Sequence, residues 1–467
     1  MKIRSHILSP SVVRGIIAVC AVVATSAAST TLAAGVVGTG SAASCSDPAL
    51  ETALAGGGVV TFACGPGPVT IDISTGTGTK IIAADTTFDG GGLITISGGN
   101  SVRVFSVNAG INFTVQNLTI ANGKTTGGGG GGGILNNGSL TVTNSTVSNS
   151  EAKPAFGGGG SGGGISNVGT LTVTNSTFSG NSTATAGGGI VNAVDGTLTV
   201  INSTFSGNSA SGFGYGGGIA NFGTVTVTNS TFSDNSASNA GGGIYNNGGT
   251  VTNCTFSGNS AAPGKGGGIA NVGTLTVTNT IVANSTSGGN CAGSVTDGGH
   301  NLDDGTTCGF TGTGCTGTSG SSFCSTNPQL DPAGLANNGG TTQTIALEPE
   351  SPAINAGDET ICAAPPVKHL DQRGAIRPGT GAANCSIGAY EYSSVNPPAH
   401  TATPTATPTR TLMPSHTPTS TPTATPNAGG GGGGGCAIAP TGSGSAGWWL
   451  LVGALVLARP RRTARGS

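Results

Sequence analysis

One stretch of the chain returns every 24 to 31 residues. Gly169–Ser182 reads GTLTVTNSTFSGNS, and close copies begin at Gly196 and Gly223. The asparagine in this stretch aligns seven copies, each with a valine two residues earlier: Asn117, Asn144, Asn175, Asn202, Asn229, Asn253 and Asn279. A repeat of this length is typical of solenoids, in which each copy buries its apolar residues only against its neighbours.

Each copy has the hydrophobic pattern of short β-strands. Leu171 and Val173 alternate with threonine, and Phe178 comes three residues after the aligned asparagine. Alternation predicts a strand with one face inward, and the break in parity at Phe178 predicts a turn near the asparagine. A second landmark, GGGI, is followed by an asparagine two residues after its isoleucine: Ile134, Ile165, Ile190, Ile219, Ile244 and Ile269.

The two landmarks predict an all-β fold, a parallel β-solenoid with one coil per copy, because no helical pattern lies between the strands. We place this solenoid at residues 45–285. Stacked strands lie about 4.8 Å apart, so roughly ten coils would make a rod on the order of 50 Å long.

The aligned asparagines have two interpretations. Several of them begin N-x-[ST] sequons, and five are considered as candidate glycosylation sites: Asn144, Asn175, Asn202, Asn229 and Asn253. Their parity with leucine and valine instead predicts that all seven point inward as a structural ladder, with each amide bonding the next coil. A buried asparagine carries no glycan, and we therefore expect the ladder.

These landmarks resemble a known repeat. GGGI and the F-x-x-N pattern, as in Phe178–Asn181 and Phe205–Asn208, are similar to the polymorphic outer-membrane protein repeat of chlamydial surface proteins, which is marked by GGA[ILV] and FxxN. The resemblance covers about residues 110–285, with GGG as a departure from GGA. It implies a right-handed parallel β-helix on a bacterial surface.

The composition of the chain limits its possible partners, and its N-terminal residues indicate the compartment in which it acts. The chain has 467 residues, 88 of them glycine, with 7% charged residues and a net charge of −2. Nucleic acid is therefore not an expected partner. Lys2, Arg4 and Arg14 precede an apolar run that ends in small residues, which is the pattern of a secretion signal. We assign residues 1–34 to a signal peptide and expect an exported protein.

Outside the cytoplasm, cysteines usually pair. Pairing sequence neighbours gives four possible disulfides, although the sequence does not decide the connectivity: Cys45–Cys64, Cys291–Cys308, Cys315–Cys324 and Cys362–Cys385. Cys254 is left over. No CxxC pair is present, so we expect no zinc site.

Parallel β-helices include polysaccharide-cleaving enzymes, which need paired carboxylates or calcium-binding carboxylates with a base. The acids in the clear repeats occupy different repeat positions, and the best remaining group is Asp85, Asp89 and Arg103. Turn and surface roles account for these three residues, and we interpret Asp303 and Asp304 as turn residues in place of a calcium site. We expect no catalytic residue, metal or cofactor.

The segment after the repeats contains NNGG, SPAINAGD, DQRG and IGAYE motifs. It resembles the choice-of-anchor Q domain, which is found at the end of bacterial β-helix surface proteins and implies no catalysis. A solenoid needs a cover over its last coil. We assign residues 286–393 to a cysteine-containing cap at that end and expect Arg373 and Glu391 to pair within it.

The remaining C-terminal residues have a composition unlike the repeats. Residues 394–435 are rich in threonine, proline and glycine and predict an extended, disordered linker. Residues 436–467 begin with Cys436, continue with an uncharged run that would just span a bilayer, and end in arginines. This tail resembles the Myxococcus type of C-terminal sorting signal, which implies that Cys436 is a processing or lipid-attachment residue.

Together these features predict an exported protein at the cell surface or outer membrane of a Gram-negative bacterium, with a structural or adhesin-like role. The expected partners are the export and C-terminal sorting machinery, the membrane through the tail, and an extracellular polysaccharide or host-surface ligand. The alternative is a carbohydrate-active β-helix enzyme, which clustered carboxylates on one solenoid face would favour.

Overall fold

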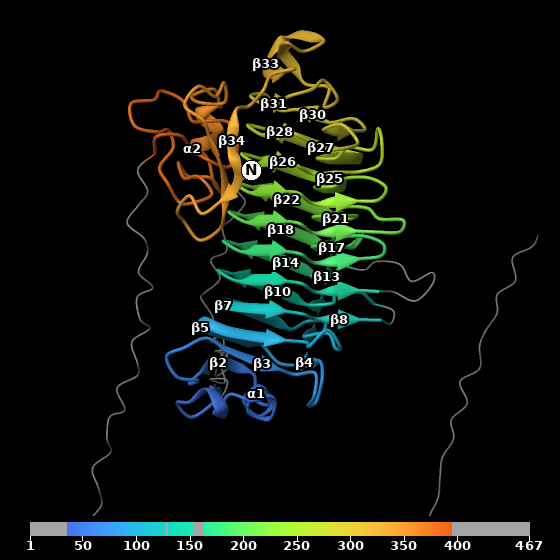
Figure 1. Cartoon of the computed structure of the whole chain (residues 1–467), viewed down its shortest axis with the longest axis vertical. Coiled ribbons are helices and arrows are strands. Elements are labelled where there is room, and N and C mark those ends of the chain that lie inside the picture. The colour runs from blue at the N-terminus through green and yellow to red at the C-terminus, as the bar shows by residue number, and fades with distance from the viewer. Residues whose placement is uncertain (1–34, 127–128, 154–161, 395–467) are drawn as a thin grey trace, which may run out of the picture. The chain divides into compact units, whose positions relative to one another are not determined.

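The computed structural model describes residues 35–126, 129–153 and 162–394. Most of these residues form a right-handed parallel β-helix of about nine turns (Figure 1). The handedness and the solenoid predicted from the repeat are confirmed. The signal peptide, most of the linker and the sorting tail lie outside the described residues. No helix among the residues described is long and apolar enough to cross a membrane.

Four columns of parallel strands make the coils. Column 1 holds the strands of the GGGI landmark: β4 (Lys80–Ile82), β6 (Phe105–Val107), β9 (Ile134–Asn136), β13 (Ile165–Asn167), β17 (Ile190–Asn192), β21 (Ile219–Asn221), the first parts of β25 (Ile244–Thr252) and β27 (Ile269–Thr278), and β29 (Cys291–Ala292). Column 2 holds the strands that precede the aligned asparagine: β1 (Gly35–Val37), β2 (Gly58–Phe62), the first parts of β5 (Thr86–Ser97) and β7 (Asn112–Ala121), β10 (Ser139–Thr143), β14 (Thr170–Thr174), β18 (Thr197–Ile201), β22 (Thr224–Thr228), the last parts of β25 and β27, and β30 (Thr296–Asp297).

The strands after the aligned asparagine form the third column. Column 3 runs through β3 (Val69–Asp72), the last parts of β5 and β7, β11 (Thr146–Ser148), β15 (Thr177–Ser179), β19 (Thr204–Ser206), β23 (Thr231–Ser233), β26 (Thr255–Ser257), β28 (Ile281–Ala283), β31 (Leu302–Asp303) and β33 (Gly317–Cys324). The short column 4 consists of β8 (Lys124–Thr125), β12 (Glu151–Ala152), β16 (Ser182–Thr183), β20 (Ser209–Ala210) and β24 (Ser236–Ala237). Pairing in register places like residues above one another, so Phe178 pairs with Phe205 and Leu171 with Leu198.

The core is built from these stacked like residues. The rings of Phe178, Phe205, Phe232 and Phe256 are fully buried and stack with centroids 4.6–4.9 Å apart. The third glycine of GGGI leaves room for them, since a Cβ on Gly218 would lie 3.1 Å from Cδ1 of Phe232 and 2.6 Å from the Gly243 carbonyl oxygen. The glycine in place of alanine therefore follows from the aromatic core.

The aligned asparagines do not point inward, and that part of the prediction is wrong, although Asn144 does donate to Asn117 and Asn175 to Asn144 from coil to coil. All seven have φ between 45° and 54°, because they form the tight corner between columns 2 and 3. A left-handed residue leaves the alternation of the strand, so the parity argument stops at this corner. Asn144 is exposed, and Asn117, Asn175 and Asn202 are partly exposed. Asn229, Asn253 and Asn279 are buried, but under a different part of the chain.

Two inward ladders exist, and other asparagines form them. Side-chain amides of the GGGI-x-N positions bond from coil to coil at 2.6–3.0 Å: Asn136, Asn167, Asn192, Asn221, Asn246 and Asn271. Those of the F-x-x-N positions do so at 2.9–3.0 Å: Asn181, Asn208, Asn235 and Asn259. Because each amide can both donate and accept, identical side chains satisfy one another along the stack.

The parallel ladder extends beyond the expected 45–285 at both ends. It begins at β1, whose Gly35 pairs with Val60, and continues to β33, whose Phe323 pairs with Leu302. A helix, α1 (Asp47–Leu54), packs on β1 with Leu50 fully buried. Next to the 3-10 turn at Ala42–Ser44, this helix covers the first coil.

The end of the stack is closed by its own residues. The Asp297 carboxylate accepts hydrogen bonds from the backbone N–H groups of Gly299 and Thr311 and from three side chains of the last coils. Asp303 accepts from the N–H groups of Gly305 and Cys308 in a turn, as interpreted from the sequence. The short strand β32 (Thr311–Thr313) pairs with β33 beside these carboxylates.

Residues 326–394, here called the side domain, lie along the stack and not over its last coil (Figure 1). They contain β34 (Leu330–Ala336) paired antiparallel with β35 (Thr344–Leu347), and α2 (Glu359–Ala363). The expected position at the end is therefore wrong for this later part of the predicted cap, because the first part, up to Cys324, already closes the last coil. Hydrogen bonds instead join the side domain to the corners from Asn202 to Asn279.

The structure contains the four disulfides that pair sequence neighbours, at Cys45–Cys64, Cys291–Cys308, Cys315–Cys324 and Cys362–Cys385. Three fasten loops near the two ends of the stack, and the fourth lies in the side domain. Cys254 is free and fully buried. Burial raises the pKa of its thiol to about 12, so it stays a protonated core residue.

Candidate binding groove

The acidic groups proposed from the sequence do not assemble into a catalytic site. Asp85 and Asp89 lie four residues apart along the extended chain of β5, which separates them by about 13 Å. Glycosidase carboxylates lie roughly 5–9.5 Å apart. Both instead accept hydrogen bonds from neighbouring coils, Asp85 from Asn112 and Asp89 from Gln116 and Asn117.

The basic residues proposed with them are also structural. Arg103 donates from Nε to the Gly131 carbonyl oxygen at 2.9 Å and from Nη2 to that of Gly130 at 2.7 Å. Burial lowers the pKa of its guanidinium. Arg103 therefore orders the start of a GGGI turn and faces no carboxylate that it could assist.

The pair expected between Arg373 and Glu391 is replaced by two adjacent pairs. Arg373 lies 2.6 Å from the Asp371 carboxylate and donates to the backbone oxygen of Glu391. The Glu391 carboxylate pairs with Arg377 at 3.3 Å, and both side chains are fully buried. Burial raises the pKa of Glu391 and lowers that of Arg377. Ser386 and the Gly379 N–H saturate the carboxylate, so the group is a structural link.

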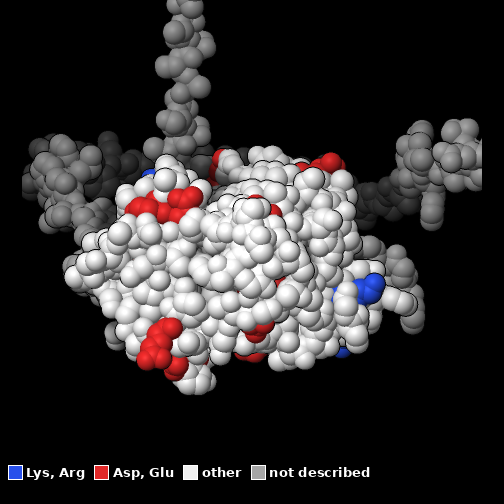
Figure 2. Space-filling view, turned by 90° about the horizontal axis from the view of Figure 1, so that it is seen from above, with Lys and Arg blue, Asp and Glu red and all other residues white. Residues whose placement is uncertain are grey.

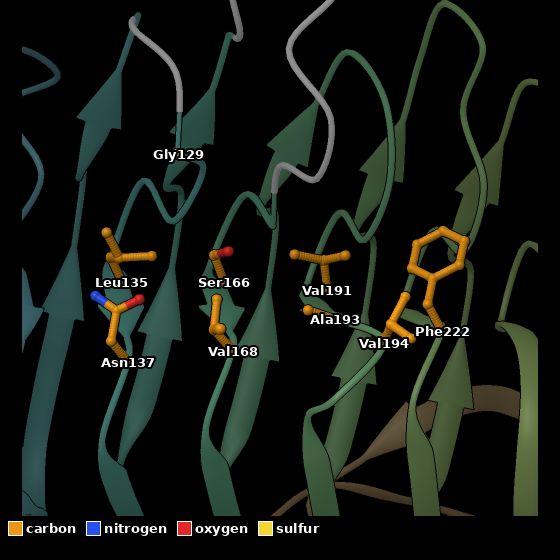
Figure 3. A pocket seen from close by; sticks show the side chains of 9 residues that line it. All are labelled: Gly129, Leu135, Asn137, Ser166, Val168, Val191, Ala193, Val194 and Phe222. Atoms are coloured by element: carbon orange, nitrogen blue, oxygen red, sulfur yellow. The ribbon is translucent and has the colours of Figure 1, made fainter. Parts of the chain in front are cut away.

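A shallow groove follows the outer face of column 1. Its first hollow, of about 420 Å³, is lined mainly by residues at the centre of a column 1 strand or just after it (Figure 3): Gly129, Leu135, Asn137, Ser166, Val168, Val191, Ala193, Val194 and Phe222. Isoleucine and asparagine of each I-x-N strand point inward, so the residue between them points outward. These outward residues are predominantly apolar, and most of them are covered by neighbouring side chains. The exposed apolar side chains come just after the strand, as in Val194, which leaves 74% of its surface exposed.

Further along the same column lies a second hollow, of about 440 Å³. It is lined by Tyr215, Asn239, Ala240, Tyr245, Gly264, Lys265, Ala270, Asn271, Val272, Ala292 and Gly293. Tyr245 belongs to β25, and its ring centroid lies 4.8 Å from that of Tyr215 and 5.7 Å from that of Phe222. The aromatic cluster Tyr215–Phe222–Tyr245 thus joins the two hollows into one groove.

The groove crosses several coils on a face that the side domain leaves open. From β9 to β27 it spans five strand steps of about 4.8 Å, or roughly 24 Å. In Figure 1 the strands of column 1 lie along the right of the stack and the side domain along the left. Exposed apolar side chains along this face, at Val168, Val194 and Val272, make it a candidate interaction site.

The groove is almost uncharged. Among the described residues that line its two hollows, Lys265 is the one charged side chain. The end-on view of Figure 2 likewise shows a mostly uncharged surface with scattered acidic and basic groups. Partial burial raises the pKa of Tyr245, which keeps its hydroxyl protonated at neutral pH. The described lining of the groove therefore offers apolar faces, amides, hydroxyl groups and one ammonium group, and it contains no carboxylate.

Sequence analysis missed this groove because its residues occupy different repeat positions. Tyr215 precedes a GGGI landmark, Tyr245 follows the isoleucine of the next, and Phe222 follows an inward asparagine. Aligning the residue after each GGGI isoleucine would have shown an outward column of Leu135, Ser166, Val191, Ala220, Tyr245 and Ala270. No signal in the sequence shows that loop and strand residues meet there.

The proposed anchor residue Cys436 lies outside the described residues. Comparison with known proteins matches residues 104–287 to the family model described as a right handed beta helix region. No curated protein and no solved structure shows significant similarity to the chain. Domains of this family occur both in enzymes and in proteins without enzymatic activity, so the fold does not decide between the two.

Proposed function

We propose that this chain is an exported β-helix protein, anchored at the surface of a Gram-negative bacterium, that binds an extracellular polysaccharide along column 1 without cleaving it. Its role is adhesin-like, with the rigid stack displaying the groove. The observation that carries the proposal is the open groove around Tyr215, Phe222 and Tyr245, whose described lining contains no carboxylate.

The shape and the chemistry of the groove favour a linear glycan. A pyranose ring has flat C–H faces, which pack on aromatic rings, and an edge of hydroxyl groups, which bond to amides. The groove supplies both, with aromatic rings from two coils and the amides of Asn137 and Asn239 beside them. Its direction along the stack suits a chain with repeating units.

A peptide added as an extra strand fits this face less well. Such binding needs a strand edge with free backbone groups. β13, β17, β21 and β25 are each paired on both sides by the neighbouring coils. A ligand of this face meets side chains only, which favours recognition through rings and hydroxyl groups.

The test is a glycan array and a depolymerisation assay on the same sample of the chain. We expect retention of one class of polysaccharide, loss of that binding in Tyr245→Ala, and unchanged binding in the control Val36→Ala, an exposed substitution on the first coil. Absence of binding to every polysaccharide would contradict the proposed function. Release of shorter products would contradict the non-catalytic part and favour a carbohydrate-active enzyme.

The anchoring part of the proposal rests on residues 1–34 and 394–467. We propose export by the N-terminal signal peptide, and removal of the tail after about Cys436 by the sorting machinery, with Cys436 as the processing or lipid-attachment residue. Mass spectrometry of the surface form tests this. We expect peptides to end near Cys436, and an intact Ser467 on the mature protein would contradict the processing step.

A further inference from the structure

The hollow at Tyr215 and Tyr245 differs chemically from the other half of the groove. The first hollow is lined by aliphatic residues such as Val168, Val191 and Val194. The second combines two tilted tyrosine rings, an amide and a lysine ammonium. One ligand that contacts both halves therefore meets a neutral surface and then a positive charge.

Lys265 is free to meet a ligand. Other cations of the described stack are engaged: Lys80 pairs with Asp47 and Glu51, and Lys124 and Lys153 both pair with Glu151. No carboxylate of the described residues lies within ion-pairing distance of Lys265. Its backbone is fixed by a hydrogen bond from its N–H to the Ala262 carbonyl oxygen, and its carbonyl accepts from the Gly241 N–H.

We infer that this second hollow binds an anionic sugar unit of the polysaccharide, with the sugar ring packed against the cluster of Tyr215 and Tyr245 and the anionic group on Lys265. This inference rests on the proposed function and specifies the ligand of the same groove. Asn239 lines the hollow and supplies a polar group for the sugar hydroxyls. A carboxylate and a sulfate offer the same charge to an ammonium, so the class is an acidic glycan.

Charge complementarity separates this ligand from other anions. A nucleic acid presents a phosphate on every nucleotide and needs a row of cations. The groove offers one cation at one end of an apolar surface. The ligand is therefore a glycan in which acidic units are separated by neutral ones, or whose acidic unit is terminal.

The test compares neutral, carboxylated and sulfated forms of the same oligosaccharide by calorimetry on the whole chain. We expect an acidic form to bind about three- to fivefold more tightly than the neutral form, which is the range for an exposed ion pair. Added salt should remove this difference. The carboxylated and sulfated arms show which anionic group is recognised.

Variants assign the effect to Lys265. Lys265→Met should bind the acidic form no better than the neutral one, while Lys265→Arg keeps the preference. The matched control is Lys368→Met, an exposed lysine of the side domain without a described ion pair. Thermal unfolding checks that each variant is folded.

Two outcomes are distinct. Equal binding of neutral and acidic forms, unchanged in Lys265→Met but lost in Tyr245→Ala, would overturn the acidic-sugar inference and leave the proposed function intact. Absence of binding to all three forms and to the glycan array would overturn both.

Discussion

The same repeat has two different environments in this molecule. In the coil of Gly169–Ser182, Asn175 bonds to Asn144 in the preceding coil and Thr177 is partly exposed. Two coils later, Asn229 donates to the Leu370 carbonyl oxygen and Thr231 to Oε1 of Gln372, and both are buried under the side domain. A nearly identical sequence is thus a surface in one place and an interface in the other.

One residue that differs between the corners helps to explain why the side domain binds only part of a uniform stack. Most corners present asparagine followed two residues later by threonine, but Asn279 is followed by Ile281. Ile281 packs with Leu302, Leu347, Ala353 and Ile387 in a small apolar cluster separate from the main core. Ile281 thus adds an apolar contact to the hydrogen bonds that the threonines of other coils, such as Thr204 and Thr231, make with the side domain.

The largest effect should come from the buried ion pair that holds the side domain together. Arg377→Met leaves Glu391 buried without its counter-ion, which costs about 3–5 kcal/mol. Urea unfolding of the whole chain, followed by tyrosine fluorescence, measures the loss. In the control, Lys153→Met removes an exposed pair and should change stability by less than about 0.5 kcal/mol. Equal losses of stability in the two variants would show that the buried ion pair contributes no more than the exposed one.

A smaller loss of stability is expected when Ile281 is replaced by threonine, which is the residue of the other coils. Ile281→Thr removes buried methylene groups and buries a hydroxyl, and we expect a loss of about 2–3 kcal/mol. Hydrogen exchange should show faster exchange in residues 330–391 and unchanged exchange in coils near Leu171. Uniform loosening of the whole stack would contradict a role in positioning the side domain.

The two environments can be compared directly with one substitution. Thr231→Val leaves the Gln372 amide oxygen without its donor, and we expect a loss of about 1–2 kcal/mol. Thr177→Val at the uncovered position should change stability by less than about 0.5 kcal/mol. Both are measured by urea unfolding. If the two losses are the same, the side domain does not distinguish these coils energetically.

The smallest effect is on pH dependence. Desolvation by burial raises the pKa of Asp297 and of Asp358. Hydrogen bonds from backbone and side-chain donors outweigh this and hold both pKa values below the ordinary range. A carboxyl with a lowered folded pKa stabilises the fold above its unfolded pKa, and this contribution is lost as pH falls through the folded value. Stability should therefore decline below about pH 4.

The raised pKa of Glu391 acts in the opposite direction, because protonation of that carboxyl is easier in the folded state. Thermal melts between pH 2 and 7, compared with Asp297→Asn, measure the dependence. We expect a shallower acid limb in Asp297→Asn, and an unchanged limb would show that Asp297 does not stabilise the closed end.

Much of the structure of one coil could be predicted from the repeat, and the predictions that were wrong have physical causes. Alternation located the core residues Leu171 and Val173, but it assumed extended backbone, and the left-handed corner at Asn175 ended that assumption. The inward asparagines were visible at a fixed place in each copy, as Asn167 and Asn181 show. The groove was not visible in the repeat, because Tyr215 and Tyr245 become neighbours only when two coils stack.

By itself, the sequence determined the parallel stack and its columns of like residues. These follow from local alternation, the repeat period and short loops, which act over one or two coils. Only the tertiary structure decided where the side domain lies, which of seven equivalent asparagines are buried, and where an open aromatic groove forms. Those outcomes depend on contacts that no single repeat unit contains, such as Tyr215 with Tyr245 in the next coil and Asn229 with Leu370, which lie 141 positions apart.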